Sequence, residues 1–443
     1  MRKKKNAFTL IELLAVIAIL AIILVISIPK ILDVIETSKI NTLKNAVKLI
    51  ADSAEKKYTE NEAFGEENEI TCDSVSKLNK EDYNKCTIIF DENGIAKVSI
   101  LGRGKFKGLK VIEATKTNAE VKEITKPTYG MKATEYITNL LEYDGEGLKI
   151  DNTSDANIRY YGANPNNYVS FNNELWRIIG VFGNNVKLIR KDSLGSLLWD
   201  SSESRVNGGY GVNEWSQADL QVYLNKMYYG GDTTVTCYGD SNNTTTTCPT
   251  NTIDETSKAL IDNHIWNTGA PNDSTLYDST TNSYDTVEFY KAERGTVNGK
   301  ICSSGSYCND TVTRKTEWTG YIALPYVTDW AYASGENICE TNMNEGYYAG
   351  ASSPDEAFAN AVCKNNNWMN YGSTYNDTTW FMSPRANPND ASRVWFVYGA
   401  GAAEYGSAAR SRAVAPSIYL KSNALIESGN GTSSNPYILK AGA

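Results

Sequence analysis

Apolar residues dominate the first part of the chain after a short basic segment. Residues 8–28 form a run of 21 in which Glu12 is the only charged side chain, and residues 2–5 before it are Arg and Lys. At about 1.5 Å of rise per residue, a helix of this length covers roughly 30 Å, the thickness of a bilayer core. We therefore predict a transmembrane helix over residues 8–28, followed by Pro29.

Beyond Pro29 the apolar positions keep a helical period but occupy only one face of the helix. A one-sided apolar face packs on another protein element rather than in lipid. Charged residues such as Lys44, Lys48 and Glu55 fall on the other faces. The apolar positions of this face are Leu43, Val47, Ile50, Ala54 and Tyr58.

Strand patterns follow this helix. Residues 86–90 and 95–101 flank an Asn-Gly pair, which is a strong hairpin signal, and residues 106–112 offer a third strand. The pattern predicts one helix with a small antiparallel sheet over residues 29–117. Residues 118–128 are polar and charged and contain a proline, so we predict a linker there.

Residues 129–443 differ in composition, because they are rich in Tyr, Trp, Asn, Gly and Thr, with short apolar runs between turn residues. This pattern predicts a larger α+β domain. We predict strands at 168–171, 175–182, 186–190, 321–324, 380–383, 394–398 and 417–420. We predict helices at 217–228, 254–266 and 328–333, with N-caps at Ser216, at Thr252 or Asp254, and at Thr328 or Asp329.

The chain is acidic. Its net charge is −9, and it is −13 without the four basic residues 2–5. Broad, non-specific binding of phosphate groups requires clustered Lys and Arg. Nucleic acid is therefore not expected as a partner.

The segment Lys5-Asn6-Ala7-Phe8-Thr9-Leu10-Ile11-Glu12-Leu13-Leu14 resembles the N-terminal cleavage and methylation signature of type IV prepilins and type II secretion pseudopilins. The resemblance implies that a prepilin peptidase removes the leader, residues 1–7, and methylates Phe8. Glu12 then becomes the fifth residue of the mature chain and Pro29 the twenty-second. Ala7 departs from the glycine that is usual before the cleavage site, although it is also small.

The same resemblance implies a location and partners. The helix would cross the inner or cytoplasmic membrane once and then enter a filament with other pilin or pseudopilin subunits, with the C-terminal domain outside the cell. Glu12 can pair with the α-amino group of Phe8 on a neighbouring subunit, which offsets two charges in an apolar setting. The alternatives are a plain membrane anchor and a secretory signal peptide, but a signal peptide ends its apolar stretch after about 7–15 residues.

The eight cysteines fall as four neighbouring pairs, and an even number in an exported chain indicates disulfides. Four local bridges are favoured, although spacing alone leaves the connectivity open. No Cys-x-x-Cys occurs and His264 is the only histidine, so we predict no metal site and no cofactor. Loops such as residues 240–243 lack the spaced acidic residues of an EF-hand, so turn formation is favoured over calcium binding. The pairs are Cys72 with Cys86, Cys237 with Cys248, Cys302 with Cys308, and Cys339 with Cys363.

Residues 324–333, Leu-Pro-Tyr-Val-Thr-Asp-Trp-Ala-Tyr-Ala, are similar to the Leu-Pro-Thr-Glu-x-Glu-Trp-Glu-Tyr-Ala element of formylglycine-generating-enzyme-like domains. Those domains are variants of the C-type lectin fold. The resemblance covers about residues 150–425 and implies a C-type-lectin-like fold within the disulfide-stapled domain that we predict over residues 129–443. The enzymes need cysteines near the end of the domain, and here none follows Cys363. We therefore interpret Trp330 and Tyr332 as core aromatics.

Catalysis is not expected. Ser-His-Asp chemistry would depend on His264, which we place on the apolar face of a predicted helix with Ile261 and Ile265 and interpret as structural. The carboxylates have no arrangement typical of a glycosidase acid and base.

One local cluster combines arginines with aromatic residues, the types enriched at binding hot spots. We predict that its loops and strand ends form a recognition surface for a surface glycan or protein. The alternative interpretation places the aromatics in the core and pairs the arginines with the excess carboxylates. The cluster contains Trp380, Arg385, Arg393, Trp395, Tyr405, Arg410 and Arg412.

The sequence thus predicts a pilin-like subunit, either a minor or tip pilin or a large pseudopilin, that displays a recognition domain. The alternative function is a membrane-tethered surface enzyme, an oxidoreductase or hydrolase that uses the helix as an anchor. The sequence leaves open whether the filament is a pilus or part of a secretion or competence system.

Overall fold

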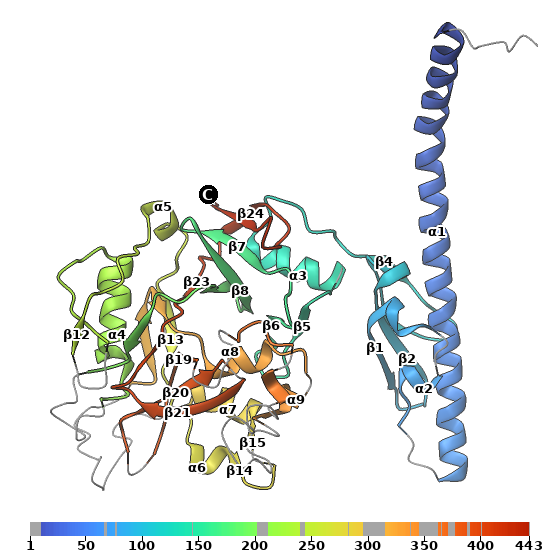
Figure 1. Ribbon diagram of the computed structural model, residues 1–443. Coiled ribbons are helices and arrows are strands. Elements are labelled where there is room, and N and C mark those ends of the chain that lie inside the picture. Colours follow the sequence, from blue (N-terminus) through green and yellow to red (C-terminus); the bar gives the residue numbers. More distant parts are fainter. Residues whose placement is uncertain are drawn as a thin grey trace, which may run out of the picture. The chain divides into compact units, whose positions relative to one another are not determined.

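The computed structural model describes residues 10–65, 69–75, 78–143, 145–201, 211–239, 244–281, 283–295, 315–336, 338–344, 362–364, 366–370, 377–387, 390–399 and 401–442. The chain divides into two compact units (Figure 1). The first unit contains Met1–Lys126 with Glu142–Gly145, and the second contains Pro127–Leu141 with Glu146–Ala443.

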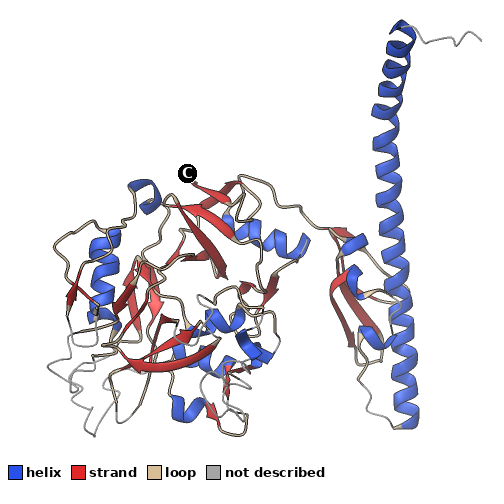
Figure 2. Cartoon of the chain, in the orientation of Figure 1, coloured by secondary structure: helices blue, strands red, loops and turns tan. Residues whose placement is uncertain are grey.

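The first unit consists of one long helix and a four-stranded antiparallel sheet, which lies along the C-terminal half of the helix (Figure 2). The helix is α1 (Leu10–Phe64), and the strands of the sheet are in the order β1-β2-β3-β4. The strands are β1 (Tyr83–Phe90), β2 (Ala96–Gly102), β3 (Leu109–Ala114) and β4 (Val121–Glu123), with a short helix α2 (Cys72–Val75) before them.

The predicted apolar face of α1 forms the core of this unit. Leu43, Val47, Ile50 and Ala54 are buried together with alternate residues of β2 and β3, and the Tyr58 ring stacks on Phe90 with 4.6 Å between ring centroids. Full burial of each Leu, Val or Ile side chain of this face contributes about 1.5–3 kcal/mol. The helix is therefore held to the sheet by one stripe, as the spacing predicts.

The predicted hairpin turn is also present. The Asp91 carboxylate accepts the backbone N–H groups of Asn93 and Ile95, and Gly94 has φ +74°. This left-handed conformation favours glycine. β3 begins at Leu109 rather than at residue 106, because residues 104–106 form a 3₁₀ turn. The predicted linker 118–128 is not entirely a linker, since it contains β4, whose Val121 packs against the core.

The second unit contains a larger sheet with the strand path β17-β23-β9-β8-β7-β25-β24, to which β6 and β5 add beside β8. The strands predicted at 168–171, 175–182 and 186–190 form its centre as β7, β8 and β9. The members are β5 (Leu148–Ile150), β6 (Ile158–Tyr160), β7 (Tyr168–Phe171), β8 (Glu174–Phe182), β9 (Asn185–Arg190), β17 (Ile322–Ala323), β23 (Ser417–Tyr419), β24 (Ala424–Ser428) and β25 (Tyr437–Ala441).

A second sheet of this unit has the order β10-β22-β19-β20-β21 and includes the predicted strands 380–383 and 394–398. Its members are β10 (Ser196–Leu198), β19 (Thr378–Pro384), β20 (Arg393–Tyr398), β21 (Ala402–Ser407) and β22 (Ser411–Ala413). Smaller sheets pair β11 (Cys237–Tyr238) with β12 (Thr245–Thr246), β13 (His264–Asn267) with β16 (Glu317–Gly320), and β15 (Ser283–Asp285) with both β14 (Tyr277–Asp278) and β18 (Asn342–Met343).

The helices of the second unit are short. They are α3 (Ala133–Tyr143), α4 (Asp219–Val222), which continues as π-helical turns (Tyr223–Tyr229), α5 (Glu255–Lys258), α6 (Asp273–Leu276), α7 (Thr286–Glu293), α8 (Val327–Tyr332) and α9 (Ile338–Thr341). The predicted helices 217–228 and 328–333 correspond to α4 with its continuation and to α8. Trp330 and Tyr332 are fully buried, which confirms that they are core aromatics.

The predicted helix 254–266 is wrong beyond its first turn. Asp254 caps α5 by accepting the Ser257 N–H, but the helix ends at Lys258 and β13 begins at His264. In β13, Trp266 is buried whereas Ile265 is 57% exposed, so the side chains alternate as in a strand. Pairing with β16 therefore overrides the apolar spacing that suggested a helix.

The Asp254 cap is confirmed, but the other two predicted N-caps are wrong. The cap of α4 is Ala218, not Ser216, whose hydroxyl donates instead to Glu214. The cap of α8 is Tyr326, and Asp329 in the first turn accepts the Tyr326 N–H at 2.9 Å. Asp329 thus takes part in the cap from inside the helix.

Three of the four predicted cysteine pairs are disulfide-bonded: Cys72 with Cys86, Cys237 with Cys248, and Cys339 with Cys363. Cys302 and Cys308 lie outside the described residues. A bridge that closes a loop of about 15 residues contributes roughly 3 kcal/mol in the chain-entropy model. The Cys72–Cys86 bridge therefore ties α2 firmly to β1.

Candidate functional site

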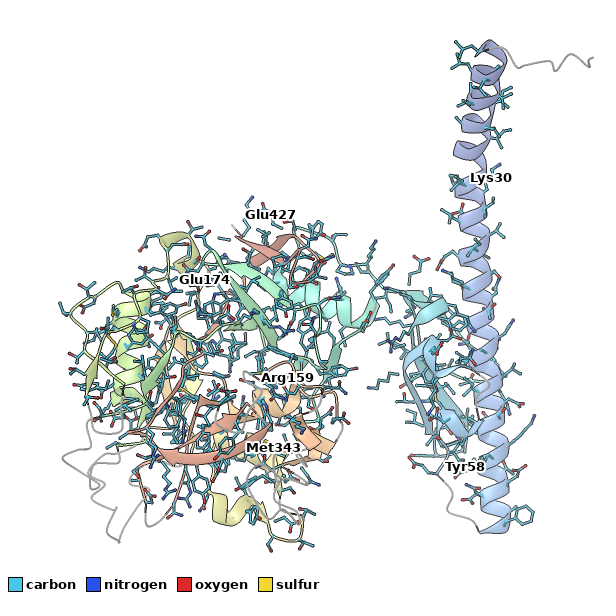
Figure 3. The ribbon with its side chains drawn as sticks, viewed as in Figure 1. Lys30, Tyr58, Arg159, Glu174, Met343 and Glu427 are labelled. Atoms are coloured by element: carbon cyan, nitrogen blue, oxygen red, sulfur yellow. A yellow bond between two sulfur atoms is a disulfide. The ribbon has the colours of Figure 1, made fainter. Side chains whose placement is uncertain are left out.

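The N-terminal half of α1 is the largest apolar surface of the described chain that nothing covers within its own unit. No strand of this unit lies beside α1 near Lys30 (Figure 3). Thirteen large apolar side chains on this half are each at least 45% exposed. They are Leu10, Leu13, Leu14, Val16, Ile17, Ile19, Leu20, Ile23, Ile28, Ile31, Leu32, Val34 and Ile35.

Leaving such a surface in water is unfavourable by about 1.5–3 kcal/mol for each side chain that could be fully buried. Contiguous apolar surface of this extent marks a contact with protein or lipid. Pro29 lies within this half, and α1 continues through it to Phe64. Glu12 also lies in α1, whereas Ala7 and Phe8 are outside the described residues. Within the residues that the structure describes, no helix is both long enough and apolar enough to cross a membrane.

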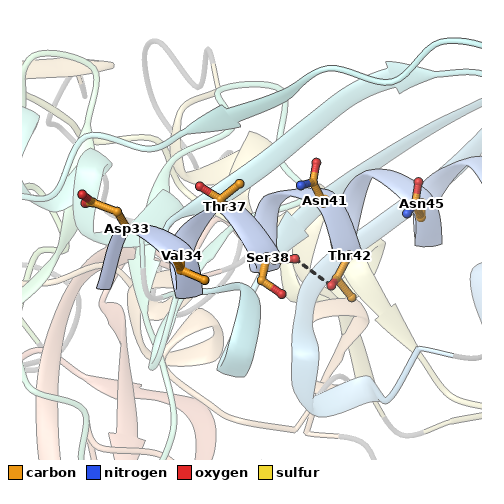
Figure 4. Close-up of a pocket in the computed structure, with 7 residues that line it drawn as sticks. All are labelled: Asp33, Val34, Thr37, Ser38, Asn41, Thr42 and Asn45. Carbon is orange, nitrogen blue, oxygen red and sulfur yellow. Dashed lines mark hydrogen bonds between the residues drawn. The ribbon is translucent and has the colours of Figure 1, made fainter. Parts of the chain in front are cut away.

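Towards the sheet, the exposed face of α1 becomes polar. An open depression on this face is lined entirely by α1, with Asp33, Thr37, Asn41 and Asn45 among its residues (Figure 4). The Thr42 hydroxyl donates to the Ser38 carbonyl at 2.7 Å, so this hydroxyl is satisfied by the helix itself. The helix surface thus changes from mostly apolar to mixed before it reaches the sheet.

The arginine–aromatic cluster in the second unit differs from the predicted recognition surface. Trp380 and Trp395 are fully buried, so they are core residues and do not form a ligand surface. The Trp380 indole N–H donates to the Leu197 carbonyl at 3.1 Å, and Trp395 packs edge-on against Phe289 and Tyr405. Burying a tryptophan side chain removes a large apolar area from water and so stabilises the fold, which explains why both residues lie in the core.

The arginines of the cluster separate into two groups. Arg385 and Arg393 lie against the Tyr405 ring, 3.8 and 5.7 Å from its centroid, and both pair with Asp390. Arg412 instead lies over the Phe396 ring at 3.6 Å. Arg385 is buried, whereas the Arg393 side chain is 43% exposed. The alternative interpretation, that these arginines pair with carboxylates, is therefore confirmed for Arg385 and Arg393, whereas Arg412 packs on aromatic rings.

Arg410 differs from the other arginines of the cluster. It is exposed, in the turn after β21, and its backbone N–H donates to the Ser407 carbonyl at 3.2 Å. Ser407 is the cross-strand partner of Arg393. Arg393 and Arg410 are therefore at the same end of the β20–β21 hairpin, and they are the accessible cations of the predicted set.

Sequence reasoning missed a buried ion network in the second unit, which includes Arg159 (Figure 3). Asp329 on α8 accepts Lys187 Nζ at 2.6 Å through Oδ2 and Arg159 Nη1 at 2.6 Å through Oδ1. Arg159 Nε donates in turn to Asp151 at 2.8 Å. All four side chains are at most 1% exposed, and the network contains two charges of each sign.

Aromatic rings enclose the two cations of this network. The Arg159 guanidinium lies 4.3 Å from the Phe182 ring centroid, and Lys187 Nζ lies 4.2 Å from that of Tyr326. Burial lowers the pKa of Lys187 to about 8, against the opposing effect of Asp329. Burial also opposes ionisation of Asp329, but Lys187 and Arg159 outweigh it and lower the pKa of its carboxyl. The network is therefore ionised at neutral pH.

Neither this network nor His264 has the organisation of a catalytic site. The network is enclosed. Its charged groups bond to each other, to the α8 cap and, through Asp151, to Thr153 and Asn157, while Arg159 Nη2 makes no hydrogen bond among the described residues. His264 is half-buried on β13, where its ring stacks on Tyr419 at 3.7 Å and contacts Asp262 at 3.0 Å. Burial lowers the pKa of His264, which keeps the ring neutral at pH 7. No group of three or more His, Cys, Asp or Glu that could hold a metal occurs among the described residues.

Comparison with known protein families gives one match, at the start of the chain. Residues 2–28 match the family model of the prokaryotic N-terminal methylation motif. Over these residues the match supports the predicted resemblance to type IV prepilins and pseudopilins. It covers the apolar run, Glu12 and the predicted cleavage site, and it supports processing by a prepilin peptidase and assembly with other pilin subunits. No curated protein and no solved structure matches the chain.

Proposed function

We propose that this protein is a minor or tip subunit of a pilin-like filament, anchored by α1 before assembly and displaying the second unit outside the cell. The observation that carries the proposal is the coincidence of the methylation motif with the exposed apolar half of α1. A helix that is apolar on all sides requires lipid or other helices around it. A filament core made of such helices supplies those contacts.

Glu12 gives the proposed assembly its specificity. A carboxylate within an apolar run costs about 2.5–3.5 kcal/mol at bilayer depth, so it is retained where it has a partner. In the proposed filament this partner is the α-amino group of Phe8 on a neighbouring subunit, exposed by removal of residues 1–7. The pair brings each subunit into register with the next.

The size of the second unit favours a position that occurs rarely along the filament. This unit spans more than 300 residues, against 130 for the first unit. A subunit of this bulk is difficult to repeat along a thin filament, whereas one copy at a tip has open space around it. We propose that the second unit serves recognition, with its ligand site at the accessible arginines rather than at the buried tryptophans.

The assembly role is tested by comparing two carboxylates of the same helix. Glu12→Ala is expected to leave the protein in the membrane fraction and to reduce its recovery in filaments sheared from the cell surface. Glu60→Ala is the matched control, because Glu60 is exposed on α1 far from the apolar half. Quantitative immunoblotting of both fractions measures the effect. Equal recovery of Glu12→Ala and wild type in sheared filaments would contradict the assembly role and favour a simple tether.

A further inference from the structure

Two accessible arginines of the second unit, Arg393 and Arg410, are found at one end of the β20–β21 hairpin. Arg393 Nε donates to Asp390 at 2.7 Å and its guanidinium lies against the Tyr405 ring. These contacts fix the plane of the guanidinium while its side chain stays 43% exposed. The bond to Asp390 uses Nε, and Nη1 and Nη2 make no hydrogen bond to the part of the chain that the structure describes. A guanidinium held this way presents two parallel donors, which match the two oxygens of a carboxylate.

Arg410 supplies a second cation at the same end. Its side chain is exposed and forms no ion pair with any described residue. It follows Ser407, the cross-strand partner of Arg393, by one turn of chain. Asp390 is shared between Arg385 and Arg393, and Arg410 has no ion pair among the described residues, so positive charge exceeds negative charge among the ion pairs at this hairpin end.

The charge of the whole unit restricts which anion fits. Residues 127–443 contain 22 Lys and Arg against 34 Asp and Glu, a net charge of −12. A densely charged polyanion is repelled by such a surface, because its charges extend well beyond the two arginines. A mostly neutral ligand that carries one isolated carboxylate meets the local positive charge without that repulsion.

The structure also disfavours an extended peptide as the ligand at this edge. β21 is an edge strand, and peptides commonly add to such edges through backbone hydrogen bonds. Here the Asn344 side-chain amide already occupies the edge, since it donates to the Ala403 carbonyl at 2.6 Å and accepts the Ala403 N–H at 2.9 Å. Strand addition along β21 is therefore blocked.

We propose that Arg393 and Arg410 bind the single carboxylate of a largely neutral oligosaccharide at the end of the β20–β21 hairpin. This inference rests on the proposed recognition role and names its ligand class. A negative result for this inference would leave the assembly proposal standing, because N-terminal processing and filament recovery do not depend on either arginine.

The test uses the full chain in detergent and two probes that differ by one acidic sugar, 3′-sialyllactose and lactose. Saturation-transfer NMR at millimolar sugar is expected to show binding of sialyllactose at least tenfold tighter than binding of lactose. Arg393→Lys keeps the charge but loses the paired donors, so it is expected to weaken binding of sialyllactose roughly tenfold. Arg410→Ala is expected to have a similar effect without disturbing the fold, since its side chain has no ion pair among the described residues.

Lys440→Ala is the matched control, because Lys440 is an exposed cation on β25 that is 63% accessible. It is expected to bind sialyllactose like the wild type. The proposal is overturned by equal binding of the two sugars, by no binding of sialyllactose, or by unchanged binding in Arg410→Ala. It is also overturned if a tetrapeptide with one glutamate binds in place of sialyllactose.

Discussion

The buried network around Asp329 makes a quantitative prediction about the second unit. Lys187, Arg159, Asp329 and Asp151 are enclosed, with two charges of each sign. Removing one member leaves a net charge without a partner in the interior, which costs about 3–5 kcal/mol. Lys187→Met removes the positive charge and retains most of the apolar stem. It is therefore expected to lower the free energy of unfolding by about 3–5 kcal/mol, a large part of the roughly 5–15 kcal/mol typical of a domain.

A double-mutant cycle separates the charge effect from lost packing. Asp329→Asn is also expected to be strongly destabilising, because it leaves Lys187 without a carboxylate. The double variant Lys187→Met with Asp329→Asn retains only Arg159 and Asp151, which are 2.8 Å apart and carry opposite charges. The double variant is therefore expected to lose less free energy of unfolding than the sum of the two single losses, by about 0.5–3 kcal/mol.

Denaturant unfolding followed by tryptophan fluorescence measures these losses, because all nine tryptophans lie between residues 176 and 395. The control is Lys291→Met, which breaks a surface pair with Glu288 whose side chains are 57% and 54% exposed. That pair is expected to contribute about 0–1 kcal/mol. If Lys187→Met is tolerated as well as Lys291→Met, or if the single losses add, the network is not the electrostatic unit described above.

Three further predictions concern acid stability, the helix–sheet core and the cysteines. The pKa of Asp329 is lowered in the folded state, so its stabilising contribution is present above about pH 4 and is lost as pH falls below that value. The denaturation midpoint is therefore expected to fall less between pH 6 and pH 3 in Asp329→Asn than in wild type. Leu43→Ala is expected to cost about 2–5 kcal/mol, seen as faster hydrogen exchange in β2, whereas Leu49→Ala on the exposed face (67% accessible) is expected to change little. Thiol labelling of the unfolded, unreduced protein is expected to find essentially no free cysteine, and labelling at Cys72 or Cys339 would contradict the bridges of the structure.

Regular patterning explains what the sequence predicts well. The one-sided spacing from Leu43 to Tyr58 and the Asn-Gly turn each reflect local rules, and both are confirmed. The strands that form β7, β8 and β9 are predicted for the same reason, since short apolar runs between turn residues have few alternatives. Neighbouring cysteines likewise identify local bridges without knowledge of the fold.

Long-range contacts explain what sequence reasoning misses. Residues 254–266 have helix-like spacing, but their partner β16 lies some fifty residues later and determines a strand. The Asp329 network joins Asp151, which follows β5, to side chains on β6, β9 and α8. These residues are up to 178 positions apart in sequence, and no local signal links them. Asp329 in the segment 324–333 is the one sequence feature that indicates such a network, because a carboxylate beside buried Trp330 requires a buried cation. Trp380 and Trp395 show the same limit, since composition alone does not distinguish a binding aromatic from a core aromatic.

The central claim, that the chain is processed and assembled as a pilin-like subunit, is tested most directly by the mass of its N-terminal peptide. The protein is purified from the membranes of cells that produce it and digested, and the N-terminal peptide is sequenced by tandem mass spectrometry. The account predicts a mature chain that begins at Phe8 with one methyl group on its α-amino nitrogen. A chain that retains Met1, or one that begins after Ile28, would contradict it.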